Sequence, residues 1–92
     1  MEWRLFANLA EAAGTKRATV EAGPGDTFGD ALEALLEAYP DLEPEVLDEN
    51  GELQDHVRVL RNDENPFVAG DGFETELEEG DDLAMFPPVS GG

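Results

Sequence analysis

A single amphipathic segment limits the folds open to this chain. Residues 27–40 read TFGDALEALLEAYP, and the run ends at a proline, which cannot continue a helix. Thr27 and Asp30 form a T-x-x-D pair that resembles a capping box and predicts the helix start. One apolar stripe of about three turns needs one sheet face to cover. The stripe consists of Phe28, Leu32, Leu35, Leu36 and Tyr39, opposite Asp30, Glu33 and Glu37.

The other apolar residues fall in short runs that are typical of strands. The fourth run begins with Pro66, which lacks a backbone N–H and therefore suits a sheet edge. The expected strands cover residues 2–7, 17–22, 56–62, 66–70 and 83–87. Short helical turns are expected over residues 8–14, where Gly14 would end the turn, within residues 41–51, and near residues 76–79.

This element order predicts an α+β protein with one mixed sheet of four to five strands and one main helix on one face. A helix between strands is compatible with some parallel pairing. The order is that of the β-grasp, or ubiquitin-like, fold, although several small α+β folds share it. We expect a β-grasp domain over residues 1–86 and an extended carboxyl-terminal tail over residues 87–92.

The charge is strongly one-sided, because 23 acidic residues face five basic ones and the net charge is −18. Such a surface repels phosphate backbones and anionic lipid, so we expect neither nucleic acid nor membrane as a partner. A basic protein partner or adaptation to high salt would explain the acids. Their spread over every segment favours the halophilic explanation. The charge also opposes self-association, so we expect a monomer.

Several kinds of site are excluded by composition. The chain has no cysteine, which removes disulfides, thiolate metal sites and cysteine nucleophiles. His56 is the only histidine and has no partners for a metal site or a catalytic triad. We therefore expect no metal and no bound cofactor. The amino terminus lacks a signal-peptide pattern and no apolar run approaches a membrane span, so we expect a cytoplasmic protein.

The chain ends in MFPPVSGG, an apolar run followed by two prolines and two glycines. The prolines would end the sheet and hold the chain extended. Glycines without a Cβ can enter a channel too narrow for other residues, as an enzyme that adenylates a terminal carboxylate with ATP would require. The alternative is a frayed or vector-derived end. The residues expected to thread into an activating enzyme are Pro87, Pro88, Val89, Ser90 and Gly91, with Gly92 as the reacting terminus.

The ending GDDLAMFPPVSGG and the opening WRLFANLAEAAG resemble the MoaD/ThiS family of ubiquitin-like sulfur carriers. The acidity makes the chain similar to the small archaeal modifier proteins of haloarchaea. This resemblance implies that an E1-like enzyme adenylates Gly92 with ATP. The product would form an isopeptide bond with a lysine of a target protein, or become a thiocarboxylate for molybdopterin-type sulfur transfer. The chain would then be a substrate and carrier, not an enzyme.

Strand alternation predicts two differently occupied sheet faces. The helix is expected to cover Trp3, Leu5, Val57, Val59, Leu83 and Met85. The opposite face would carry Arg4, Phe6, Arg58, Leu60, Ala84 and Phe86. In a β-grasp the first and last strands are neighbours, so the two phenylalanines and Leu60 would cluster near Arg4, Arg58 and Arg61. An apolar patch ringed by charge is typical of a binding face. Alternatively, a loop covers Phe6 or Phe86.

Lys16 is the only lysine and sits in a predicted exposed turn, so it is the one internal amine that could accept a second copy's carboxyl end. Two other functions remain open. The chain could be a non-covalent β-grasp adaptor with an inert tail. It could also be the small subunit of a molybdopterin synthase, with that enzyme's large subunit as partner.

Overall fold

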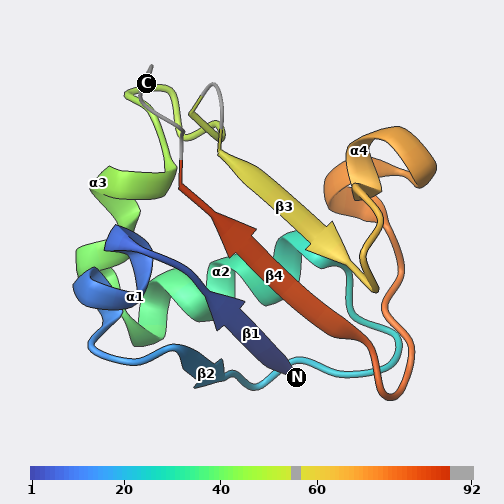
Figure 1. The fold of residues 1–92 in the computed structure, drawn as a ribbon. Coiled ribbons are helices and arrows are strands. Elements are labelled where there is room, and N and C mark those ends of the chain that lie inside the picture. Colours follow the sequence, from blue (N-terminus) through green and yellow to red (C-terminus); the bar gives the residue numbers. More distant parts are fainter. Residues whose placement is uncertain (55–56, 88–92) are drawn as a thin grey trace.

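A computed structural model describes residues 1–54 and 57–87 of the 92 residues. It shows an α+β fold with one four-stranded sheet, whose open face is toward the viewer in Figure 1. The strands are β1 (Glu2–Leu5), β2 (Arg17–Thr19), β3 (Arg58–Arg61) and β4 (Asp82–Phe86). The α-helices are α1 (Asn8–Ala13), α2 (Phe28–Ala38), α3 (Glu43–Val46) and α4 (Pro66–Ala69). Two 3-10 turns are η1 (Pro40–Leu42) and η2 (Gly72–Glu74).

The sheet has the strand order β2-β1-β4-β3. The first and last strands are central neighbours and run parallel, with Trp3 opposite Leu83. The outer strands β2 and β3 pair antiparallel with β1 and β4, respectively. The predicted mixed sheet and the adjacency of the first and last strands are therefore confirmed.

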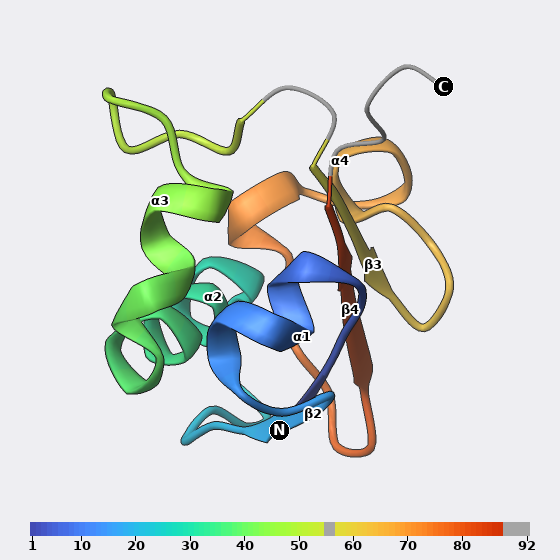
Figure 2. The ribbon, with the colours of Figure 1, turned by 60° about the vertical axis from the view of Figure 1, so that its left-hand side comes forward.

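Helix α2 forms where the sequence predicts it, because its amino-terminal capping box is complete. The Asp30 backbone N–H donates to Thr27 Oγ1 at 3.1 Å, and the Thr27 backbone N–H donates to the Asp30 carboxylate at 3.0 Å. Helix α1 ends at Gly14, which adopts the left-handed conformation with φ 78°. Figure 2 views the sheet nearly edge-on and shows α2 and α3 on the same side of it. The helices leave the other sheet face open.

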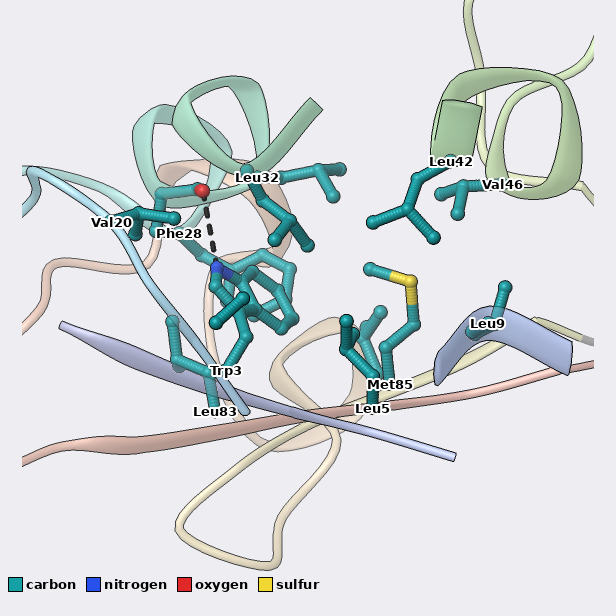
Figure 3. Close-up of a cluster of buried hydrophobic side chains, with 14 of the residues drawn as sticks. Trp3, Leu5, Leu9, Val20, Phe28, Leu32, Leu42, Val46, Leu83 and Met85 are labelled. Atoms are coloured by element: carbon teal, nitrogen blue, oxygen red, sulfur yellow. Dashed lines mark hydrogen bonds between the residues drawn. The ribbon is translucent and has the colours of Figure 1, made fainter. Parts of the chain in front are cut away.

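The core lies between this helical layer and the inner face of the sheet (Figure 3). Trp3 is fully buried, packs edge-on against Phe28 with ring centroids 5.5 Å apart, and donates its indole N–H to the Ala31 carbonyl of α2. The side chains predicted to face the helix are buried or half-buried in this core. They are Trp3, Leu5, Val57, Val59, Leu83 and Met85. Tryptophan thus joins the two layers by packing and by one hydrogen bond.

Two sequence-based expectations are wrong. Residues 66–70 do not form an edge strand, because Asn65 caps a helical turn there, accepting a hydrogen bond from the Phe67 backbone N–H at 2.8 Å, with Pro66 in the first turn. A proline at that position is favourable in a helix as well as tolerable at a sheet edge. The turn expected near residues 76–79 lies earlier in the chain, at η2. The strands are also shorter than predicted, and β1 ends at Leu5.

No helix within residues 1–54 and 57–87 is long and apolar enough to cross a membrane. The same ranges hold no group of three or more histidine, cysteine or acidic side chains placed to bind a metal ion. His56 lies outside the described residues.

Candidate functional site

The open face of the sheet carries the predicted binding residues in two neighbouring rows. In the first row Arg58 of β3 lies opposite Phe86 of β4. In the second row Arg4, Ala84 and Leu60 lie side by side on β1, β4 and β3. Neighbouring strands are about 4.8 Å apart, so both rows belong to one compact surface. We call this surface, made of Arg4, Phe6, Arg58, Leu60 and Phe86, the sheet patch.

The two phenylalanines of the sheet patch stack on each other. Their ring centroids are 4.3 Å apart and the ring planes differ by 8°. Phe6 follows the last residue of β1, yet it remains 37% exposed, while Phe86 is half-buried. The described residues therefore place no loop over the Phe6 ring. Its stacking partner is Phe86, from the opposite end of the sequence.

The basic residues around the patch are not equivalent. Arg4 bridges to Asp82 at 2.9 Å and to Asp63 at 3.7 Å, which ties its guanidinium to the start of β4. Its Nε is buried and finds no hydrogen-bond partner within the described chain. Arg58 is exposed beside Phe86 and makes no ion pair with any described residue. Of the two, Arg58 is the cation more available to a partner.

Arg61 does not join the sheet patch, contrary to expectation. Arg61 is two residues from buried Val59 on β3, so both side chains lie on the same face of the sheet, opposite the sheet patch. The Arg61 Nε donates a hydrogen bond to Asp81 at 2.7 Å. Burial raises the pKa of Asp81. Hydrogen bonds from the Glu78 backbone N–H, the Asn62 amide and Arg61, with the Arg61 charge, outweigh that effect and hold the pKa below the ordinary 3.8. This pair fixes the turn before β4.

The sheet patch lies beside the point at which the predicted tail leaves the sheet. Phe86 is the last residue of β4, and Pro87, which follows it, is half-buried. The rest of the predicted tail, Pro88, Val89, Ser90, Gly91 and Gly92, lies outside the described residues. The sheet patch is therefore adjacent to Pro87, the last described residue of the chain.

Lys16 is exposed, as predicted, immediately before β2. Its backbone carbonyl accepts a hydrogen bond from the Leu5 N–H at 2.8 Å, which fixes the main chain while the side chain faces solvent. An open hollow of about 600 Å³ separates this segment from α1 and reaches Phe6. The lysine is therefore near the sheet patch but is not part of it.

The model of the ThiS family matches residues 3–92 of this chain. The chain belongs to the ThiS family. This member is 52% identical to small archaeal modifier protein 1 of Haloferax volcanii, over the full length of both chains. It is 38% identical to small archaeal modifier protein 3 of the same organism, over 100% of this chain and 98% of the relative.

The fold agrees with this assignment. The crystal structure of SAMP1 from Haloferax volcanii superposes with a TM-score of 0.87 at 49% identity, over 100% of this chain and 98% of that one. The ThiS-family chain is thus a ubiquitin-like β-grasp protein of the modifier and sulfur-carrier type, and not itself an enzyme. Its acidity, predicted as an adaptation to high salt, fits these Haloferax volcanii relatives.

One surface escaped the sequence analysis. Phe67, Val68 and Phe73 are exposed at α4 and η2, away from the sheet patch. Phe67 and Val68 were missed because residues 66–70 read as an edge strand, and Phe73 was missed because it falls in a stretch that reads as a loop. The available signal was two aromatic residues within a stretch otherwise rich in acids, where a soluble surface gains nothing from phenylalanine.

Proposed function

We propose that the reacting group of this protein is the carboxylate of Gly92, activated by an E1-like enzyme. The carboxylate attacks the α-phosphorus of ATP, forms an acyl–phosphate bond and expels pyrophosphate. The resulting acyl adenylate is a mixed anhydride, so its carbonyl carbon is open to attack, and AMP is a good leaving group. The chain itself needs no bound cofactor, because the activating enzyme supplies the ATP site. ATP use also places the protein in the cytoplasm under this proposal.

The adenylate has two fates. In the first, the amine of a target-protein lysine attacks the carbonyl carbon, AMP departs, a proton is released and an isopeptide bond forms. In the second, a hydrosulfide ion displaces AMP and leaves a thiocarboxylate. That group can donate sulfur in a molybdopterin-type reaction, with a molybdopterin synthase large subunit as the receiving partner. Both fates need the same free carboxyl end and the same activation.

The observation that carries this proposal is the Phe6–Phe86 stack beside the end of β4. A partially exposed aromatic pair next to Arg58 offers an apolar and cationic surface on an otherwise acidic protein. An activating enzyme that binds this surface would hold the sheet at a set distance from the ATP bound to that enzyme. The residues after Pro87 can then reach about 3.4 Å each when extended, so five of them span about 17 Å.

The decisive experiment follows ATP–pyrophosphate exchange by the cognate activating enzyme with the full chain as substrate. Deletion of Gly92 withdraws the reacting carboxylate by one residue, and Gly91→Ala adds a Cβ that obstructs a narrow channel. We expect either change to reduce exchange at least about a hundredfold. Gly23→Ala is a matched control, because a Cβ at Gly23 meets nothing within 4 Å. Normal function in cells of the chain that lacks Gly92 would support the alternative, an adaptor with an inert tail.

Mass spectrometry of native cell extract separates the two fates. After trypsin digestion, residues 62–92 joined to a lysine of another protein indicate conjugation, because Arg61 is the last basic residue of the chain. A free chain with one oxygen replaced by sulfur indicates the thiocarboxylate. Lys16→Arg keeps the charge and removes the only internal acceptor amine. Loss of self-conjugates in that variant, with conjugation to other proteins unchanged, would identify Lys16 as the acceptor of a second copy.

A further inference from the structure

A groove of about 700 Å³ runs along the solvent side of α2, away from the sheet patch. Its apolar floor is formed by Leu32, Leu36 and Leu47, and Phe73 of η2 stands at one end. We call it the helix-side groove. Leu36 and Leu47 are half-buried and Phe73 is 38% exposed, so much of this apolar surface is accessible to a partner. None of the described residues that line it is a lysine or an arginine.

The Phe73 end of the groove is rigid. The Phe73 ring packs edge-on against Phe67 with centroids 4.9 Å apart, and Phe67 packs edge-on against buried Phe28 at 6.3 Å. The backbone N–H of Phe28 donates to the Thr75 carbonyl at 2.8 Å. A Cβ on Gly29 would lie only 3.1 Å from the Phe73 carbonyl oxygen, which shows how closely η2 sits on α2. The exposed aromatic ring is therefore held in place before any partner binds.

Acidic side chains surround the apolar floor, and all of them are exposed. The residues are Asp30, Glu33, Glu37, Glu43 and Glu74. Residues 18–57, which include α2, η1 and α3, contain twelve acids and neither lysine nor arginine. No described residue of that stretch is a cation that could neutralise the rim. An anionic rim around an apolar floor excludes nucleic acid and anionic lipid, and it selects for a cationic occupant.

We propose that the helix-side groove binds a cationic amphipathic segment of a partner protein, without covalent chemistry. The segment places aliphatic or aromatic side chains on the leucine floor and lysine or arginine side chains toward the rim. Helix α2 has 11 residues and is about 16 Å long, which matches about three turns of a partner helix. A second copy of this chain is a poor occupant, because its net charge is −18.

This surface is independent of the tail chemistry. The groove is lined by residues of α2, α3 and η2, whereas the sheet patch lies on the sheet face turned away from α2. Figure 2 shows the ribbons of α2 and α3 on one side of the sheet. The same molecule can therefore bind a partner through the groove while Gly92 is free or already joined to a target.

The test uses the full-length ¹⁵N-labelled chain, at the lowest KCl concentration at which it stays folded, and a synthetic 14-residue amphipathic helix of leucine and lysine as the probe. Two control peptides accompany it. One replaces every lysine by glutamate and keeps the apolar face, and the other scrambles the sequence so that no apolar face remains. We expect amide shifts at Leu36, Leu47 and Phe73 with the lysine peptide, and none with either control.

Matched variants locate the binding site. Phe73→Ser should weaken binding of the lysine peptide about tenfold, whereas Phe6→Ser, at an equally exposed phenylalanine of the sheet patch, should leave it unchanged. Glu33→Gln combined with Glu37→Gln should weaken binding about threefold. Glu78→Gln combined with Glu79→Gln removes the same charge away from the groove and should have no effect.

Four results would overturn the proposal. They are equal binding of the scrambled peptide, shifts centred on Phe6 and Phe86, no shifts up to millimolar probe, or concentration-dependent shifts at the groove without peptide, which would reveal a second copy there. Measured in parallel, ATP–pyrophosphate exchange should be normal for Phe73→Ser. If the parent chain binds the peptide at the groove but supports no ATP–pyrophosphate exchange, the proposed tail chemistry is wrong and the groove proposal is unaffected.

Discussion

The two layers of this small protein differ in how they distribute charge. All five basic residues belong to the strands or lie next to them, and four of the five are arginines. On the sheet layer Arg4, Arg17 and Arg61 pair with Asp82, Glu2 and Asp81. The helical layer has acids without internal cations. The cations of this strongly negative protein are thus confined to the sheet layer.

The comparison teaches that net charge alone does not describe the surface. A partner that approaches the sheet meets stacked aromatic rings and an available arginine, whereas one that approaches the helices meets leucines behind carboxylates. Both surfaces contain exposed phenylalanine, but their charge preferences are opposite. The two faces are therefore suited to partners of different chemistry.

The largest expected effect comes from breaking the connection between the layers. Trp3→Ala removes the buried indole, its contact with Phe28 and its hydrogen bond to Ala31. We expect a loss of about 3–5 kcal/mol in the free energy of unfolding, measured by urea denaturation in molar KCl. Trp3→Phe keeps most of the apolar volume and should lose less than half as much. Equal losses in the two variants would show that the hydrogen bond, and not the packing, dominates.

A smaller effect is expected at the ion pair between Arg61 and Asp81, which is shorter and less exposed than the other pairs of the described residues. The Asp81 pKa is lower in the folded protein than the ordinary 3.8, so its stabilisation is complete above that value. The stabilisation is lost as pH falls through the folded pKa. Asp81→Asn should lower the free energy of unfolding by about 1–3 kcal/mol at neutral pH. Its stability should also fall less steeply below pH 3.8 than that of the parent chain. An unchanged acid slope in denaturation curves would contradict this assignment.

The sheet patch should matter more for activation than for stability. Phe6→Ser disrupts the stack with Phe86 and is expected to cost only about 1 kcal/mol, because the ring is already partly exposed. ATP–pyrophosphate exchange should nevertheless fall about tenfold, mainly through a higher KM. Phe73→Ser is the control from the helical layer. Equal exchange defects in the two variants would remove the functional distinction between the faces.

The smallest effect comes from replacing exposed carboxylates. This change should raise the free energy of unfolding on the helical layer and lower it on the sheet layer. Glu33 and Glu37 are exposed one helical turn apart, so replacing both with glutamine should raise stability at low salt by about 0.3 kcal/mol. Asp82→Asn breaks the pair with Arg4 and should lower stability by about 0.5 kcal/mol. Molar KCl should reduce both differences, since it shortens the Debye length to about 3 Å. If both variants were stabilised, or both destabilised, the proposed difference in charge between the two layers would be wrong.

Local sequence patterns determined the elements whose signals are contiguous. The capping pair Thr27 and Asp30 and the apolar stripe define α2, and Gly14 ends α1, because each depends on residues within one or two turns. Strand alternation likewise assigned the side chains of β1 and β4 to the two sheet faces, although Ala84, predicted on the open face, is fully buried there. Composition alone excluded cysteine chemistry. The reacting carboxylate inferred from the terminal MFPPVSGG pattern stays a prediction, because residues 88–92 lie outside the described structure.

The tertiary structure decided how distant residues meet. Strand alternation predicted that Phe6 and Phe86 cluster, but the stacking of their rings depends on the parallel register of β1 and β4, which are separated by most of the chain. Asn65 and Pro66 fit a helical turn or an edge strand locally, and the aromatic packing of Phe67 accompanies the helical choice. The helix-side groove forms because η2, which carries Phe73, packs closely against Gly29 of α2. Short-range patterns fix backbone conformation, whereas contacts between remote segments arise only when the whole core packs in one arrangement.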